Sequence, residues 1–148
     1  MAISFAVEDV VKPKLSYRLL IKWLKGVINE YHKKPGFLVV IFCSDSYLIK
    51  INREFLQHDY FTDIVTFDYC EKNIVSGDIF ISLDRVAENS NLFGVTVNEE
   101  LLRVIVHGIL HLLGFGDSSK DEKIIMRNLE SKYILDYKIL ENGCSEGI

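Results

Sequence analysis

The chain has 148 residues, of which 49% are hydrophobic, and a formal net charge of −4 at pH 7. This length and apolar content predict a single domain over residues 1–148 with a real core. No apolar run reaches 18 residues, so no transmembrane helix is expected, and the acidic N-terminus lacks the basic segment of a signal peptide. The three widely spaced cysteines fit a reducing cytoplasm, and we expect Cys43 and Cys70 to be buried.

The positive charge is concentrated in the first third of the chain. Residues 1–50 carry eight Lys and Arg against four Asp and Glu, whereas residues 51–148 carry nine against 17. Within a helix predicted from Ser16, three cations recur at spacings of four and three: Arg18, Lys22 and Lys25. This stripe is either an ordinary solvated helix face or a track for the phosphate backbone of a nucleic acid.

Hydrophobic periodicity and turn residues predict alternating strands and helices along the chain. In chain order we expect a strand over 3–7, a helix over 16–31, a buried strand over 37–42, a helix over 45–55, a strand over 64–69, a connection over 71–76, a strand over 78–83, a helix over 84–91 and two more helices from Thr96 and Ser119. The fold class is therefore α+β, with a small mixed β-sheet covered by helices.

The helix that begins at Thr96 is expected to be central. Thr96 and Glu99 can form a capping box, and the helix that follows is apolar on most of its surface, which is typical of a buried helix. Its one polar stripe contains Glu100, Arg103, His107 and His111 at spacings of three and four. Glu100 and Arg103 are candidates for orienting His107.

Two histidines four residues apart lie on the same helix face, which suits a zinc ion. Gly114 can take the left-handed conformation that ends a helix and turns the chain back. Asp117, six residues after His111, can then offer a carboxylate oxygen. Three protein ligands and one open position predict a catalytic zinc site with His107, His111 and Asp117. The alternative is a pair of buried histidines satisfied by neighbouring carboxylates.

Residues His107–Asp117 resemble the His-Gly-x-Leu-His-Leu-x-Gly-x-x-His signature of the YbeY family, metal-dependent endoribonucleases of bacterial ribosomal RNA maturation. Residues 52–67 are similar to that family's Asn-x-x-Tyr-Arg…Asp-x-x-Thr-Asp-Val-Leu-Ser-Phe segment, and residues 77–82 to its Gly-Asp-Ile-x-Ile-Ser strand. The resemblance extends from about Phe37 to Tyr133. Because three segments agree in order and spacing, it is specific.

This chain departs from the family pattern at two positions. Asp117 stands where the family usually has a third histidine, and aspartate can bind zinc through oxygen. Leu56 stands where the family usually has an arginine that is thought to be catalytic. Arg53, His58 and Arg103 are the candidates to replace it, and the sequence does not choose among them.

The resemblance implies a single-strand-specific, zinc-dependent endoribonuclease that acts in ribosomal RNA 3′-end maturation and ribosome quality control. One zinc ion would activate water or the ribose 2′-OH for attack on an RNA phosphodiester, and a nearby cation would stabilise the developing charge. The implied partners are single-stranded RNA and the small ribosomal subunit, and no membrane association is implied. The metal ligands His107, His111 and Asp117 tolerate several divalent ions, so the sequence does not distinguish zinc from nickel.

The segment before the strand at 64–69 contains further candidates. Thr62 is expected to hydrogen-bond its own turn. Asp63 shares a strand face with Val65 and is as well placed to face the metal cleft as to face away from it. His58 and Asp59 lie in a loop, where functional side chains gather.

Two other classes of protein compete with the ribonuclease. Metzincin-type zinc peptidases have the same ligand spacing, but they need Glu directly after the first histidine as general base, and this chain has Gly108. A non-catalytic zinc-containing ribosome assembly factor would account for the loss of the family arginine at Leu56. Such a factor would associate with ribosomes without cleaving RNA.

Overall fold

The computed structural model describes residues 2–58 and 61–146, and its four strands form one mixed sheet in the order β1-β2-β4-β3. The strands are β1 (Ala2–Val7), β2 (Lys34–Cys43), β3 (Ile64–Asp68) and β4 (Ile74–Ser82). β1 and β4 both pair with β2 in parallel, whereas β3 pairs with β4 in antiparallel orientation. The α+β class and the mixed sheet expected from the sequence are therefore confirmed.

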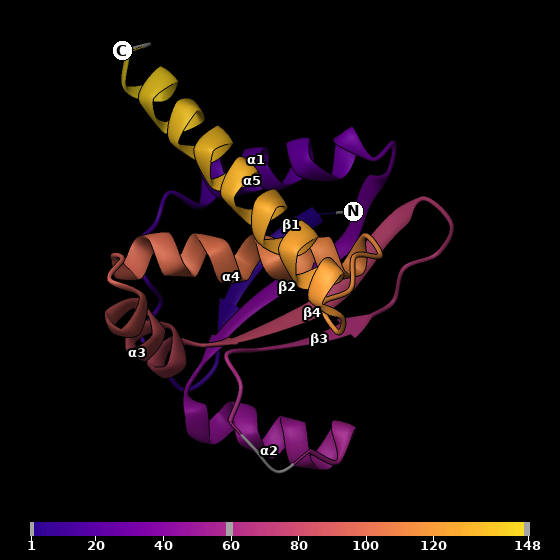
Figure 1. The fold of residues 1–148 in the computed structure, drawn as a ribbon, viewed down its shortest axis with the longest axis vertical. Coiled ribbons are helices and arrows are strands. Elements are labelled where there is room, and N and C mark those ends of the chain that lie inside the picture. The colour runs from indigo at the N-terminus through magenta and orange to yellow at the C-terminus, as the bar shows by residue number, and fades with distance from the viewer. Residues whose placement is uncertain (1, 59–60, 147–148) are drawn as a thin grey trace.

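Helices cover both faces of this sheet (Figure 1). The five helices are α1 (Tyr17–Glu30), α2 (Asp45–Leu56), α3 (Leu83–Phe93), α4 (Val97–Leu112) and α5 (Lys120–Glu146). α1 and α4 pack on one face in the main core, and α2 covers a smaller apolar cluster on the opposite face. No helix in the described part of the chain is long and apolar enough to cross a membrane.

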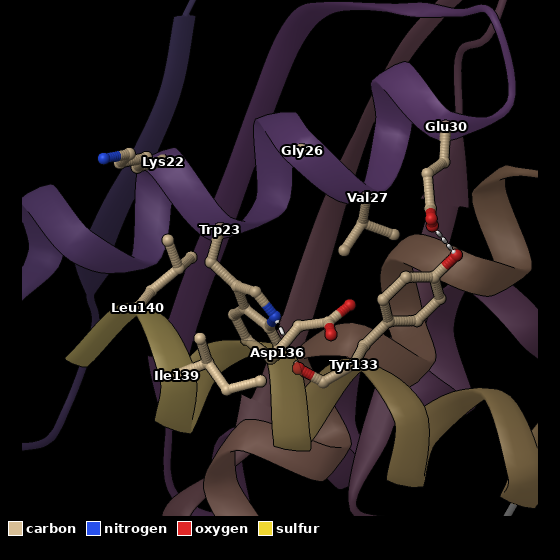
Figure 2. A pocket seen from close by; sticks show the side chains of 9 residues that line it. All are labelled: Lys22, Trp23, Gly26, Val27, Glu30, Tyr133, Asp136, Ile139 and Leu140. Atoms are coloured by element: carbon tan, nitrogen blue, oxygen red, sulfur yellow. Dashed lines mark hydrogen bonds between the residues drawn. The ribbon is translucent and has the colours of Figure 1, made fainter. Parts of the chain in front are cut away.

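α5 forms an outer layer across α1 and α4 (Figure 1). Figure 2 shows its contact with α1, where the Trp23 indole N–H donates to the Tyr133 carbonyl oxygen at 2.7 Å and the Tyr133 hydroxyl donates to Glu30. A cavity of about 410 Å³ remains between the two helices. These contacts fix the position of α5, which carries residues of the site described below.

The element boundaries differ from the predictions mainly at β4. The connection expected over 71–76 is wrong, because β4 already begins at Ile74. Glu71 and Ile74 form a β-bridge across a turn in which Lys72 has a φ of 54°, so the polar residues there belong to a tight hairpin. Cys43 is fully buried, as expected, and burial raises the pKa of its thiol to about 12, whereas Cys70 is only half-buried.

α4 has the central position that its apolar surface predicts. The Glu99 backbone N–H donates to the Thr96 hydroxyl at 3.1 Å, which confirms the helix start, while the Glu99 carboxylate accepts from Lys138 on α5. Gly108 sits directly against the sheet, because a Cβ atom there would come within 2.9 Å of Ile64 and of Ile79. The missing side chain therefore allows α4 to approach β3 and β4 closely.

Gly26 and Gly108 provide a matched test of this packing. Gly26, in α1, has no atom within 4 Å of an added Cβ, so Gly26→Ala should raise the free energy of unfolding by about 1 kcal/mol through helix propensity. Gly108→Ala should gain the same propensity but lose about 1–3 kcal/mol to overpacking. Urea unfolding measures both, and equal stabilisation by the two substitutions would contradict the close approach of α4.

Candidate metal centre

The two histidines and Asp117 meet at the C-terminal end of α4. α4 ends at Leu112, and Gly114 follows with a φ of 106°, the positive value that favours glycine. The Phe115 backbone N–H then donates to the Leu110 carbonyl oxygen at 3.0 Å, which folds the loop back against the helix. The turn therefore returns Asp117 to the face of α4 that carries His107 and His111.

The separations of these three side chains suit a tetrahedral metal ion. One Asp117 oxygen, Oδ2, lies 3.4 Å from His107 Nε2 and 3.4 Å from His111 Nε2, beyond the usual hydrogen-bond range. Zinc bonds of about 2.0–2.1 Å in tetrahedral geometry place neighbouring ligand atoms about 3.3–3.4 Å apart. The donor atoms of all three residues lie within 4.8 Å of one another, so they could hold one ion.

A buried carboxylate on α5 holds the first histidine. Glu130 is 4% exposed, and its Oε2 lies 2.6 Å from His107 Nδ1. Because a carboxylate accepts, Nδ1 carries a proton, and Nε2 is the ring nitrogen that faces Asp117. The other Glu130 oxygen accepts from Arg103 at 3.1 Å, with Arg127 at 3.7 Å.

The same contacts set the protonation of His107. Burial lowers the pKa of its imidazole, but the hydrogen bond and negative charge of Glu130, with Asp117 and Asp63, outweigh burial and raise the pKa. A metal ion competes with the proton on Nε2 only, because the Glu130 bond occupies Nδ1. The arrangement therefore favours coordination through one defined nitrogen.

A cavity of about 270 Å³ opens beside His107 and Asp117. Asp63, Glu100, Arg103, Arg127 and Glu130 contribute charged side chains to its wall. Burial raises the carboxyl pKa of both Asp63 and Glu100. Perturbed carboxyl groups next to cations in a recess are typical of a functional site.

The structure brings only some of the predicted residues to this cavity. Arg103 lines it and reaches His107 through Glu130, whereas Glu100 lines the same wall. Arg53 lies exposed on α2, which covers the opposite face of the sheet from α4 (Figure 1), and His58 lies exposed shortly after the end of α2. Asp59 lies outside the described residues.

The segment before β3 contains one residue with a structural role and one that lines the cavity. The Thr62 hydroxyl donates to the Ile64 carbonyl oxygen at 3.2 Å, so its predicted structural role is confirmed. Val65 packs in the cluster beneath α2, but Asp63 lines the cavity on the α4 face. Asp63 precedes the first residue of β3 and therefore does not follow the alternation of the strand.

Sequence reasoning did not find Glu130 or Arg127. A signal for Glu130 exists, because Met126, Tyr133, Ile134 and Tyr137 form the buried stripe of α5 and Glu130 falls within it. A charged residue on such a stripe needs a partner, which here is His107 with Arg103. Arg127 has no comparable signal, since it is an exposed helical residue.

The packing of Gly108 bears on the peptidase alternative. A metzincin-type general base would be a Glu side chain at this position, directly after the first histidine. Even a Cβ atom there would come within 2.9 Å of Ile64 and Ile79 on the sheet. Residue 108 therefore faces the core, and a longer side chain has no space there.

Comparisons with known proteins agree with one another. The family model described as Endoribonuclease YbeY matches residues 4–138. The chain is 46% identical to Endoribonuclease YbeY of Bacteroides thetaiotaomicron, covering 89% of this chain and 96% of that protein, and 48% identical to that of Bacteroides fragilis, covering 89% and 95%. The solution structure of TM1509 from Thermotoga maritima superposes with a TM-score of 0.64 at 30% identity, covering 91% of this chain and 88% of the other.

Asp63 gives a pH-dependent prediction for the metal-free protein. Burial raises its carboxyl pKa in the folded state, so the carboxylate costs stability at neutral pH, and this cost disappears as the pH falls through the folded pKa. Asp63→Asn should therefore raise the free energy of unfolding at neutral pH, and the gain should shrink in acid. Urea unfolding in the presence of a chelator, at neutral and at acidic pH, measures this gain in the free energy of unfolding. Glu54→Gln, on the exposed face of α2, is the control, and an equal gain there would contradict the prediction.

Proposed function

Because this chain belongs to the YbeY family of endoribonucleases, we propose that it cleaves single-stranded RNA at a zinc ion held by His107, His111 and Asp117. The observation that carries this proposal is the pair of 3.4 Å separations between Asp117 Oδ2 and the two imidazole Nε2 atoms. Two nitrogens and one oxygen form a donor set that zinc accepts, with a fourth position open to substrate.

When bound, the zinc ion supplies Lewis-acid polarisation of a phosphoryl oxygen and makes a hydroxyl nucleophile available near neutral pH. The residues of the chain orient the ligand, stabilise developing charge and accept a proton. Glu130 keeps the His107 ring in one orientation, and Arg103 and Arg127 face the cavity as cations for the charge that develops on phosphate oxygens. Asp63 is our candidate proton acceptor, because a carboxyl with a raised pKa is a better base near neutral pH.

Arg103 is the candidate we retain as replacement for the family arginine. Its guanidinium reaches the wall of the cavity, and Glu130 holds it at 3.1 Å. The catalytic roles expected for Arg53, which lies on α2, and for His58, which follows this helix, stay predictions. Single alanine substitutions at the three positions separate them.

We further propose ribosomal RNA as the substrate, in 3′-end maturation and quality control on the small ribosomal subunit. A single strand suits a recessed site, because its backbone can bend toward the metal whereas a duplex is stiff. A second candidate function rests on Leu56, which ends α2 where the family arginine is expected. In that case the chain is a ribosome assembly factor that keeps zinc without cleaving RNA.

Cleavage of a labelled single-stranded ribosomal RNA fragment tests the ribonuclease. The wild-type protein should cut it, whereas His111→Ala, Asp117→Ala and chelator should each abolish cleavage together with bound metal, measured by elemental analysis. Asp117→His, which keeps a ligand at this position, should retain the metal. Asp121→Ala removes a nearby exposed carboxylate and should change neither readout.

Two outcomes would overturn parts of this proposal. Full metal occupancy in Asp117→Ala would remove Asp117 from the ligand set. No cleavage by folded, metal-loaded wild-type protein would reject the ribonuclease and favour the assembly factor, which ribosome co-sedimentation would then test.

Glu130→Gln tests the positioning of His107. Glutamine keeps the volume but removes the negative charge that holds His107 Nδ1–H and Arg103, so zinc affinity should fall about 10–100-fold. Competition with a chelating dye measures the affinity independently of RNA cleavage. Glu100→Gln, at a buried carboxyl in the same cavity, should leave zinc affinity nearly unchanged. Equal losses of zinc affinity in the two variants would contradict a specific role of Glu130 in positioning His107, because they would reflect the loss of any negative charge from the cavity wall.

A further inference from the structure

A second depression adjoins the candidate metal centre. It has a volume of about 610 Å³ and is lined by Phe93 at the end of α3 and by Lys120, Lys123, Ile124 and Arg127 on the first turns of α5. We call these five residues the basic groove. Phe93 and Arg127 also line the 270 Å³ cavity beside His107, so the two spaces share a wall.

The charge of the basic groove is one-sided. Three of its five lining residues are cations and none is an acid, although the chain as a whole carries a net charge of −4. Within the part of the chain that the structure describes, neither Lys120 nor Lys123 forms an ion pair. Both lie in the first turn of α5, where a cation opposes the helix dipole. The charges of these two lysines therefore do not stabilise the helix through its dipole or through an ion pair, and they suit an anion.

The groove also exposes apolar surface. Phe93 is 54% exposed and Ile124 is 52% exposed, and the Arg127 guanidinium carbon lies 5.9 Å from the centre of the Phe93 ring. An aromatic face beside cations is the combination that binds single-stranded nucleic acid, because bases stack on the ring while cations neutralise phosphates. A free small anion would use the cations but leave the ring exposed.

The basic stripe on α1 has a different environment. Lys22, Glu30 and Asp136 all line the cavity between α1 and α5. In Figure 2 the Lys22 amine points away from this cavity and from both carboxylates. The residues that line the two depressions at the metal centre come from the segment before β3 and from α3, α4, the metal loop and α5, and α1 contributes none of them. The sequence left two alternatives for Arg18, Lys22 and Lys25, a solvated helix face and a phosphate track. The Lys22→Ala/Lys25→Ala variant in the experiment below tests the phosphate track.

From these observations we propose that the basic groove binds the stretch of single-stranded RNA that flanks the scissile phosphate. Lys120 and Lys123 contact its phosphates, and one of its bases stacks on Phe93. Arg127 lies where the groove meets the cavity, so it can contact the strand as it enters the metal centre. The inference rests on the proposed function for the identity of the nucleic acid.

Salt titration of RNA binding tests the two lysines. The probe is a short labelled single-stranded RNA with methylated 2′-hydroxyls, bound to metal-loaded protein and checked on a gel for integrity. Lys120→Ala/Lys123→Ala should lower the slope of log affinity against log salt by about 1.4, since each phosphate contact contributes about 0.7 for single strands. Lys22→Ala/Lys25→Ala removes the same charge from α1 and should leave the slope unchanged.

Phe93→Leu tests the stacking contact. Leucine keeps an apolar side chain but removes the ring face, so affinity should fall about fivefold or more while the salt slope stays the same. Phe37→Leu, at an aromatic residue on β2 that is 72% exposed, is the matched control and should bind as the wild type does.

The outcomes separate this inference from the proposed function. An unchanged salt slope in Lys120→Ala/Lys123→Ala, or unchanged affinity in Phe93→Leu, overturns the basic groove even if the wild-type protein cleaves RNA. Conversely, the expected losses of binding support the groove even if no cleavage is detected, and that result would reject only the ribonuclease. Circular dichroism and elemental analysis of each variant verify that fold and metal are retained.

Discussion

The close contact of α4 with the sheet at Gly108 is the constraint on which the rest of the structure depends. A Cβ atom at residue 108 would come within 2.9 Å of Ile64 and Ile79, so the helix can lie this near to β3 and β4 only without a side chain there. The remaining apolar residues of α4 complete the core, and the polar stripe of the helix is left to face α5 and the metal loop. The position of both histidines follows from this packing.

Buried charge is concentrated around Glu130. A buried carboxylate is costly unless it is paired, and here Arg103, Arg127 and His107 surround its two oxygens. α5 thus completes the site that α4 begins, and its packing against α1 through Trp23 and Tyr133 keeps Glu130 in place. The negative net charge of the chain is compatible with an RNA substrate, because Lys120, Lys123 and Arg127 gather in the basic groove beside the candidate metal centre.

Much of this architecture could be predicted from the sequence. Strand and helix periodicity gave the α+β class, since side chains that repeat every two or every 3.6 residues must share a buried face. The spacing of His107 and His111, with Gly114 before Asp117, indicated three donor atoms on one side of a turn, and the structure has them within 4.8 Å of one another. These features are local, because they depend on residues that are close along the chain.

The remainder depends on contacts between distant segments. Periodicity predicts which face of α5 is buried but not its partner, so the bond between Glu130 and His107, 23 residues apart, required the packed helices. The location of α2, and of Arg53 on it, across the sheet from α4 likewise depends on which face of the sheet the helix packs against. The sequence by itself thus determined the candidate metal ligands, because a helix and its terminal turn fix their spacing. Only the tertiary structure decided which charges surround them, because burial and pairing are properties of the whole fold.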